Sequence, residues 1–425
     1  MEELGPIFRA MLRNKVKFGL IVVEIALTLA VVANCAAMIL KARREISQPS
    51  GFDDENLLIV TARPLDSAMR KDESLADMLR RDREAVRATP GVHAMLETFF
   101  TPWGPNLTTT GVRPAESTME QLTVQSYPTG EGLTETLGIN LVEGREFSRE
   151  DVDRDTQRAK VFNATQHEHD ARGKPLTSFE QDVVISQAFA KHAFGDGPYV
   201  GRWLDDEAGT LFHVVGVVDR FYKPGLASDA RSNEHVMFYA DRDESYGRGF
   251  RALVRTEPGQ AVLVARDLEE RLARPGEPRQ IKVERIPEVR TTHFGPQRLV
   301  TTLMGVVIAL LVLVTALGIA GLTTFSVTER TRQIGTRRAL GATTGDILRY
   351  FLAENWLLTT LGLVLGFGLA MGLNVIVVSV FAGAKLNVPL LVLSMILLWS
   401  VGLGSAIAPA LRGARISPAV ATRNI

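Results

Sequence analysis

The chain has 425 residues, with 48 basic and 48 acidic side chains and therefore a formal net charge of zero. This balance argues against nucleic acid as a partner, because a protein that neutralises phosphates needs a concentrated basic face. The single cysteine, Cys35, excludes an intrachain disulfide and a cysteine metal cluster. Nearly charge-free stretches at the start and in the last third enclose a polar block, which indicates a membrane protein with a globular insert.

The first 17 residues predict an amphipathic helix that lies in the membrane interface, with a disordered leader as the alternative. Basic side chains lie off the apolar stripe of this helix. The stripe consists of residues at helical spacing, namely Leu4, Ile7, Phe8, Met11 and Leu12.

Four apolar stretches are long enough for the roughly 20 residues that a membrane-spanning helix needs. The first of them is too long for the apolar core of a cleavable signal peptide, and basic residues follow it, so we expect a retained anchor. It contains Glu24, which is costly in hydrocarbon and should face protein or water. A hydrogen bond within the helix bundle is favoured for Glu24 over a substrate or proton role.

Lys and Arg residues in the short flanks of the spans indicate the orientation. They gather before the first span, between the second and third, and after the fourth, whereas the loop between the third and fourth holds only Lys385. The three basic flanks lie on one side of an even-numbered topology, which is therefore the cytoplasmic side. Lys41, Arg43 and Arg44 run against this rule, but long domains cross the membrane largely regardless of charge.

The expected protein thus has both termini in the cytoplasm and the large domain outside the membrane. Its expected parts, in chain order, are a cytoplasmic interfacial helix (1–17), the first span (18–40), the extracytoplasmic domain (41–297), the second span (298–326), a cytoplasmic loop (327–355), the third span (356–380), an external loop (381–388), the fourth span (389–410) and a cytoplasmic tail (411–425).

The polar block alternates short β-rich runs with amphipathic helical ones, which is typical of an α+β domain with its own core and two lobes. The fold class is therefore a bundle of four transmembrane helices with a large α+β extracytoplasmic domain. We expect an exposed hairpin or loop over the charged, turn-rich residues 147–182. The expected strands cover 57–60, 183–185, 213–218 and 252–254, and the expected helices cover 66–89 and 262–273.

A search for chemistry in this domain yields no site. Asp151, Asp153 and Asp155 begin like a calcium loop, but the glycine and the glutamate that such a loop requires at its sixth and twelfth positions are absent. Residues 167–170 (HEHD) suit no zinc motif well. Without a Walker A pattern or a nucleophile elbow, we predict a chain that is not an enzyme, with no catalytic residue, metal or cofactor of its own.

Small residues within the spans allow close helix approach, although such residues are also simply common in membrane helices. Two G-x-x-x-G pairs lie in the third span and a further pair of glycines lies in the second. The candidate packing residues are Gly362, Gly366, Gly368, Gly372, Gly318 and Gly321.

The loop between the second and third spans reads VTERTRQIGTRRALGATTGDI from Val327 to Ile347. The second span continues as a charged helix in which Glu329 can pair with Arg332 or a neighbouring base. Gly341 then ends this helix, and Thr343 with Asp346 forms a capping-box pattern that starts the next one. The spacing predicts a short helix at the membrane surface, and an ordinary basic turn is the alternative.

This run resembles the signature E-R-T-R-E-I-G-x-R-x-A-L-G-A of the FtsX-like and MacB-type permeases of ABC transporters. Gln333 and Thr336 depart from that signature, and the region 150–182 is longer than is usual in the family. The resemblance extends, in order, over most of the chain, through LTETLGI (133–139), EGREF (143–147), VISQAFA (184–190), Gly201, VVGVV (214–218) and PALRGARISP (409–418).

The resemblance implies a coupling helix in the loop, which docks into a groove of a separate ABC ATPase subunit. Two ATPase copies, which bind ATP and Mg, would join this chain and a second permease chain, either a second copy or a sister protein. A periplasmic adaptor and an outer-membrane channel would follow in a Gram-negative cell, and membrane lipid surrounds the spans. The residues that carry the coupling role are Arg337, Arg338, Leu340, Gly341, Ala342, Thr343, Asp346 and Ile347.

The family implies a location in a bacterial inner membrane, with the large domain in the periplasm. It also implies mechanotransmission, in which ATP-driven motion reaches the periplasmic domain through the spans without cargo passing between them. Efflux of a hydrophobic or peptide-like substrate is the leading function. The alternatives are an FtsX-like regulator that activates a cell-wall hydrolase or a sensor kinase, and a permease for lipoprotein extraction.

Overall fold

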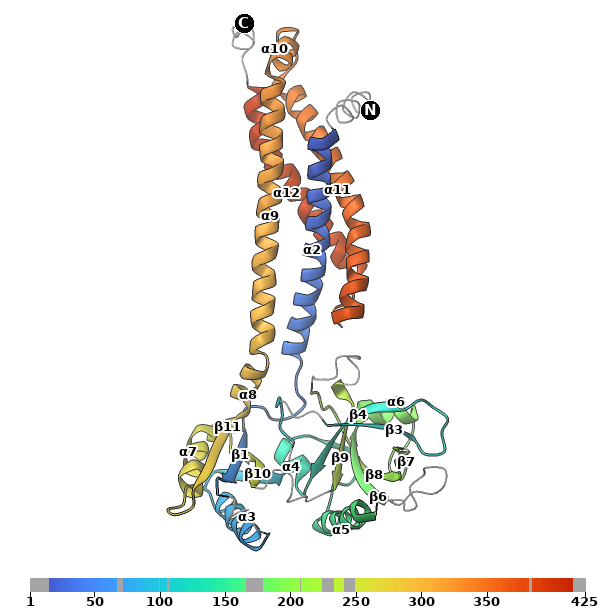
Figure 1. The fold of residues 1–425 in the computed structure, drawn as a ribbon, viewed down its shortest axis with the longest axis vertical. Helices are drawn as coiled ribbons and strands as arrows, with labels where there is room; N and C mark the ends of the chain where they lie inside the picture. The colour runs from blue at the N-terminus through green and yellow to red at the C-terminus, as the bar shows by residue number, and fades with distance from the viewer. Residues whose placement is uncertain are drawn as a thin grey trace. The chain divides into compact units, whose positions relative to one another are not determined.

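The computed structural model separates into two compact units (Figure 1). The membrane unit comprises Met1–Ile46 and Pro296–Ile425, and the inserted domain comprises Ser47–Gly295. The predicted interfacial helix lies outside the described residues except for 15–17, which begin the first span, and the end of the predicted tail lies outside them too. The described residues are 15–66, 72–98, 100–104, 108–165, 179–206, 208–223, 233–240, 249–381 and 384–415.

Among the described residues, four helices of the membrane unit are long and apolar enough to cross a membrane. The mean hydropathy of the apolar 18-residue window in each helix is 2.3, 2.8, 2.3 and 2.2 in chain order. A helix also satisfies its backbone hydrogen bonds internally, as hydrocarbon requires. They are α2 (Lys15–Ser47), α9 (Gly295–Glu329), α11 (Thr344–Phe381) and α12 (Val388–Ala414), with the short helix α10 (Thr331–Ala339) between α9 and α11.

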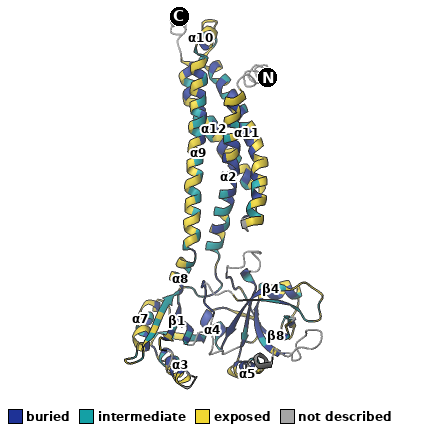
Figure 2. Ribbon diagram, viewed as in Figure 1, coloured by how far each residue is buried: buried dark blue, intermediate teal, exposed yellow. Residues whose placement is uncertain are grey.

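The core of the membrane unit gathers around α2. Ile25 and Leu29 of α2 are buried in one cluster with Ile319 of α9, Leu363 of α11 and Leu398 of α12. By contrast, α9 exposes an apolar face along much of its length (Figure 2). An apolar face of this kind is satisfied by lipid or by another membrane helix.

The inserted domain contains a four-stranded antiparallel sheet in the order β11-β1-β10-β2. Alternate residues of β1 point into the core, where Leu58 and Val60 pair across the sheet with Val254 and Ala252. Helices α3 and α7 contribute the other side of this core. The elements are β1 (Leu57–Pro64), α3 (Asp72–Arg87), β2 (Val92–Glu97), β10 (Phe250–Thr256), α7 (Ala261–Leu272), β11 (Arg279–Arg285) and then α8 (Ile286–His293).

The second sheet has seven strands in the order β5-β8-β6-β9-β4-β3-β7, and it curls until β7 also pairs with β8. This closure leaves β5 outside a ring of paired strands and encloses a separate apolar core. The elements are β3 (Thr109–Pro114), β4 (Leu122–Thr129), α4 (Leu133–Leu137), β5 (Leu141–Gly144), α5 (Arg149–Thr165), β6 (Phe179–Ser186), α6 (Gln187–Phe194), β7 (Trp203–Asp205), β8 (Thr210–Val218) and β9 (Val236–Ala240). The predicted fold class, four membrane helices with one large α+β domain, is confirmed.

The prediction of an exposed loop over 147–182 is wrong where the structure describes it, because α5 and the start of β6 fill much of this stretch. Ser148 and Asp151 form a capping box at the start of α5. The backbone amide and hydroxyl of Ser148 lie 2.9 and 2.8 Å from Oδ2 of Asp151, and the Asp151 amide lies 3.2 Å from Oγ of Ser148. The sequence carried this signal, but its high charge obscured the helix.

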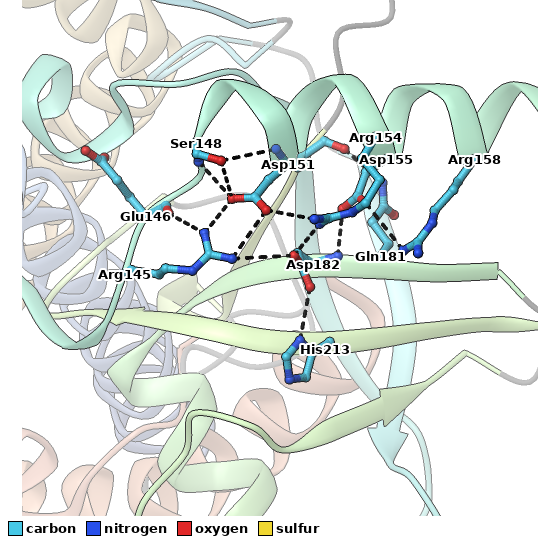
Figure 3. Close-up of polar contacts among 11 residues, drawn as sticks. Arg145, Glu146, Ser148, Asp151, Arg154, Asp155, Arg158, Gln181, Asp182 and His213 are labelled. Carbon is cyan, nitrogen blue, oxygen red and sulfur yellow. Dashed lines mark hydrogen bonds and ion pairs between the residues drawn. The ribbon is translucent and has the colours of Figure 1, made fainter.

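Two of the three aspartates that resembled a calcium loop, Asp151 and Asp155, form ion pairs with arginines (Figure 3). Arg154 pairs with Asp151 and Asp155 at 2.9 Å each and with Asp182 of β6 at 2.5 Å, while Arg145 also pairs with Asp151. Although burial favours the neutral acid, hydrogen bonds from Arg145 and Ser148 hold the pKa of Asp151 well below its usual range. This network of ion pairs holds α5 against β6 of the sheet. The carboxylates of Asp151 and Asp155 therefore bind arginine side chains.

Candidate functional site

The loop that carries the predicted coupling residues begins at a break in the helix after α9. Arg330 departs from helical geometry, with φ −99° and ψ 10°, and separates α9 from α10. Its guanidinium donates two hydrogen bonds to the carboxylate of Glu354 on α11, at 3.1 and 3.2 Å, and a third to the hydroxyl of Tyr350 at 3.1 Å. Because Glu354 is only 3% exposed, this bidentate ion pair fixes the break against the third span.

The expected ion pair of Glu329 involves a different partner. Its carboxylate lies 3.8 Å from Nζ of Lys17 on α2, instead of pairing with Arg332, which is exposed on α10. Sequence reasoning therefore missed Arg330 and Glu354. The sequence did contain one signal for this pair. Glu354 is a single acidic residue at the start of the third apolar span, and the basic loop at 327–347 precedes it.

Gly341 ends α10, as the sequence predicts, in a Schellman motif. The amide of Gly341 donates to the carbonyl of Arg338 at 3.1 Å, and the amide of Ala342 donates to the carbonyl of Arg337 at 3.0 Å. These two bonds satisfy carbonyls that a helix end leaves free. The φ of Gly341 is +101°, in a region that side chains rarely adopt, so glycine is required here.

The capping box at Thr343 and Asp346 is also present. Oδ2 of Asp346 accepts from the amide and hydroxyl of Thr343 at 2.9 and 2.6 Å, and the Asp346 amide donates to the Thr343 hydroxyl at 3.2 Å. The helix that begins here is α11 itself, which continues unbroken to Phe381. The separate short helix of the loop is therefore α10, before Gly341, and the residues after it form the first turn of the third span.

Exposure divides the predicted coupling residues into two groups. Leu340 is 84% exposed at the tip between the two caps, and Gly341, Thr343 and Asp346 are exposed beside it. Ile347 is only 4% exposed, so it is not free to contact a partner.

Ile347 belongs instead to a small core beneath the tip, with Phe351 of α11, Val327 of α9 and Ala410 of α12. Ala342 is partly buried against this core. On the flank, the guanidinium of Arg337 lies 5.3 Å from the ring centre of Tyr350. The tip is therefore a rigid turn that presents Leu340 outward and is joined by packing to the spans.

The glycines of the first G-x-x-x-G pair lie where α11 contacts α2. A Cβ atom on Gly362 would lie 2.8 Å from Cβ of Ile25, and one on Gly366 would lie 2.9 Å from Cα of Ala26. Both distances are shorter than van der Waals contact, so the absence of a side chain permits this approach.

The remaining predicted glycines fall into two classes. Gly318 on α9 faces Glu24, whose carboxylate oxygens would both lie 3.0 Å from a Cβ atom placed there. Around Gly321, Gly368 and Gly372, nothing in the described structure lies within 4 Å of such an atom. Equal spacing in the sequence thus does not mean equal packing.

We expect Gly362→Val to destabilise the membrane unit by about 1–3 kcal/mol, because the added methyl groups overlap Ile25. Thermal melting of the full chain in detergent measures this loss. The matched control is Gly368→Val, which makes the same change in helix propensity on an open face of the same helix. Equal shifts in melting temperature for the two variants would contradict the assigned α2–α11 contact.

Among the described residues, the hydrogen bond that we expected for Glu24 within the bundle is not made by its Oε1 atom, which is buried without a hydrogen-bond partner there. Polar contacts in the bundle are made by other side chains. Oγ1 of Thr28 lies 2.9 Å from Oγ1 of Thr315, and Nδ2 of Asn374 donates to Oδ1 of Asn34 at 2.8 Å.

Within the described residues, no group of three or more His, Cys, Asp or Glu side chains is placed to hold a metal ion. The run at 167–170, which suits no zinc motif well, lies outside the described residues. The features that stand out chemically are therefore the capped loop and the helix contacts beneath it.

A bundle of four membrane helices, with one α+β domain inserted after the first and a capped polar loop after the second, defines a polytopic membrane protein. Residues 305–418, which include most of α9 and all of α10, α11 and α12, match the family model FtsX-like permease C-terminal. This match and the curated relatives both support a permease of the FtsX and MacB type of ABC transporter.

Curated relatives agree with this family. The chain is 27% identical over 290 residues to the macrolide export ATP-binding/permease protein MacB of Chromobacterium violaceum, covering 66% of this chain and 40% of the relative. It is 28% identical over 247 residues to the uncharacterized ABC transporter permease YknZ of Bacillus subtilis, covering 56% of this chain and 61% of the relative. The chain thus spans less than two thirds of the length of either relative.

Two solved structures are also similar. The periplasmic region of MacB from Actinobacillus actinomycetemcomitans matches with a TM-score of 0.33 and 12% identity, covering 58% of this chain and 96% of that one. The extracellular domain of YknZ from Gram-positive bacteria matches with a TM-score of 0.30 and 16% identity, covering 53% and 99%.

Proposed function

We propose that this chain is the membrane subunit that couples ATP hydrolysis by a separate ABC ATPase to motion of its inserted domain. The proposed output is efflux of a hydrophobic or peptide-like substrate. ATP and Mg are bound by the partner, and this chain supplies the docking loop, the spans and the moving domain. The basic flanks support a cytoplasmic location for the loop and both termini, with the inserted domain outside an inner membrane.

The observation that carries the proposal is the tip at Leu340. A leucine that is 84% exposed stands between a Schellman motif and a capping box, which together fix the backbone on both sides. A rigid turn loses little conformational entropy when a partner binds it, so its apolar contact contributes efficiently to affinity. The bidentate pair between Arg330 and Glu354 then joins the loop to the third span, so force on the tip reaches the bundle.

The exposed apolar face of α9 supports a second permease chain in the assembly. Lipid can also cover such a face, but a coupling machine with two ATPase copies needs two docking loops. We therefore propose a pair of permease chains, formed by two copies or by this chain and a sister protein. A periplasmic adaptor and an outer-membrane channel complete the proposed efflux pathway in a Gram-negative cell.

Replacing Leu340 with glutamate tests the docking role. Burying a leucine contributes about 1.5–3 kcal/mol, and a carboxylate at the same contact adds a desolvation cost. We expect the affinity for the ATPase to fall by roughly tenfold or more, measured as copurification of the ATPase with the tagged chain from native membranes. Leu263→Glu is the control, because Leu263 is 72% exposed on α7 of the inserted domain.

Full retention of the ATPase by Leu340→Glu would show that the tip is not the docking contact. The same purification identifies the other proteins of the complex. An adaptor among them supports efflux, whereas a cell-wall hydrolase or a sensor kinase would replace efflux with a regulatory output.

A further inference from the structure

Two chain segments connect the inserted domain to the spans, and one arginine joins them. The incoming segment follows α2 and includes Gln48 and Asp54, while the outgoing segment is α8, which precedes α9. Arg290 of α8 donates to Oδ2 of Asp54 at 2.6 Å and to the carbonyl oxygen of Gln48 at 2.8 Å. The Arg290 and Asp54 side chains are 24% and 17% exposed, so this pair is shielded better than a surface ion pair.

Trp103, from the loop between β2 and β3, completes this contact. Its indole Nε1 donates to the other Asp54 oxygen, Oδ1, at 3.1 Å. The guanidinium carbon of Arg290 lies 4.7 Å from its ring centre, a cation–π arrangement. Phe294, at the end of α8, contacts the same ring at a centroid distance of 5.5 Å.

The backbone of Trp103 is strained to make this contact. Trp103 is 2% exposed and has a φ of +58°, a region that bulky residues rarely adopt. Such strain persists only where surrounding contacts enforce it. The indole is therefore held between the incoming and outgoing segments at an energetic cost.

The membrane unit joins the same two segments on its own side of the boundary. Nε2 of Gln297, near the start of α9, donates to Oε2 of Glu45, near the end of α2, at 2.6 Å. Each unit therefore has its own contact between the chain leaving α2 and the chain entering α9.

We propose that Arg290, with Asp54 and Trp103, is the positioning residue that makes the two connections of the inserted domain move as one body. This inference rests on the proposed function, since it concerns how motion of the spans reaches the domain. Without the Arg290 clamp, displacement of α2 against α9 separates the incoming and outgoing segments and is absorbed there. With the clamp, the same displacement turns the whole domain.

The test uses the full chain with its copurified ATPase in lipid nanodiscs, followed by hydrogen–deuterium exchange with and without ATP. In the native protein we expect ATP to change exchange both in the loop at 331–347 and in the inserted domain. In Arg290→Met the loop response should persist, while the response of the inserted domain falls by roughly half or more. A role in stability alone would not separate the two responses. The control, Arg266→Met, removes an arginine whose side chain is 82% exposed.

Two further variants guard against a folding defect in Arg290→Met. Arg290→Lys keeps the charge beside Asp54 but loses the planar guanidinium that reaches two acceptors, and should give an intermediate response. Asp54→Asn keeps an acceptor for Trp103 but removes the ion pair, and should uncouple the domain as Arg290→Met does. A full domain response in both Arg290→Met and Asp54→Asn overturns the clamp. Absence of an ATP response in the native loop overturns the proposed function and this inference with it.

Discussion

Replacing Asp82 with alanine is expected to lower the free energy of unfolding of the inserted domain by about 3–5 kcal/mol. Asp82 lies on α3 and is 0% exposed. Nη1 of Arg279 lies 2.8 Å from both of its carboxylate oxygens, and Nη2 of Arg274 lies 3.2 Å from one of them. The Arg279 side chain is only 1% exposed, so the alanine variant leaves its buried guanidinium with only the longer contact to Glu277, at 3.7 Å. Urea unfolding of the full chain in detergent, followed by tryptophan fluorescence, measures the loss.

The control for Asp82→Ala is Asp77→Ala on the same helix, where the carboxylate is 68% exposed and pairs with Arg80. We expect that change to cost less than about 1 kcal/mol, as exposed pairs do. The double variant Asp82→Leu with Arg279→Met should recover most of the loss, because it removes both charges together. Equal destabilisation by Asp77→Ala and Asp82→Ala would contradict the assigned role of the buried pair.

The parts of the fold that the sequence predicted depend on local patterns. A long apolar run has few alternatives to a membrane helix, because hydrocarbon excludes unpaired backbone groups. The runs at 57–60 and 213–218 were equally easy to recognise as strands, since they lie in β1 and β8, where most residues are buried. The caps at Gly341 and Thr343 were found for the same reason, as each is completed within a few residues.

The parts that it did not predict depend on contacts between distant segments. Arg330 and Glu354 are 24 positions apart, and nothing in either neighbourhood specifies the other. Charge density concealed α5, whose aspartates face arginines that include Arg145 from the preceding loop. Ile347 stands in the same short sequence run as the exposed residues of the loop, and the sequence does not distinguish it from them. In the structure, the first turn of α11 directs its side chain into the core. The spacing of apolar residues in the sequence predicts a helix. Which face of that helix is buried depends on contacts with segments that are distant in the sequence.

Lys223 is a lysine whose side chain is buried from solvent within the inserted domain. It is 2% exposed, and its Nζ atom lies 4.7 Å from the ring centre of Tyr127 and 3.4 Å from the carbonyl oxygen of Thr101. Burial, together with the nearby charge of Arg251, lowers the pKa of Lys223 to about 7. The burial of His293 itself and the charge of Lys223 lower the pKa of His293.

The inserted domain should therefore become more stable as the pH rises from about 7 to about 10. In that window the unfolded chain keeps a proton on Lys223, whose ordinary pKa is 10.5, while the folded domain has lost it. Because the unfolded state then binds more protons, Lys223 raises the free energy of unfolding by up to about 1.4 kcal/mol per pH unit. Below pH 7 both states carry the proton, and this contribution stops changing. Urea midpoints of the full chain, measured across this range, should rise more steeply than those of Lys223→Met.

Lys223→Met removes the buried amine while keeping much of its apolar stem, so the variant should gain stability at neutral pH and lose this part of the pH slope. The matched control is Lys282→Met on β11, where the side chain is 61% exposed and the native slope should be retained. Subtracting the two profiles cancels the other groups that titrate in alkali, which both variants share. Identical slopes in Lys223→Met and Lys282→Met would mean that Lys223 keeps an ordinary pKa, and that water or another acceptor reaches its amine beside the Tyr127 ring.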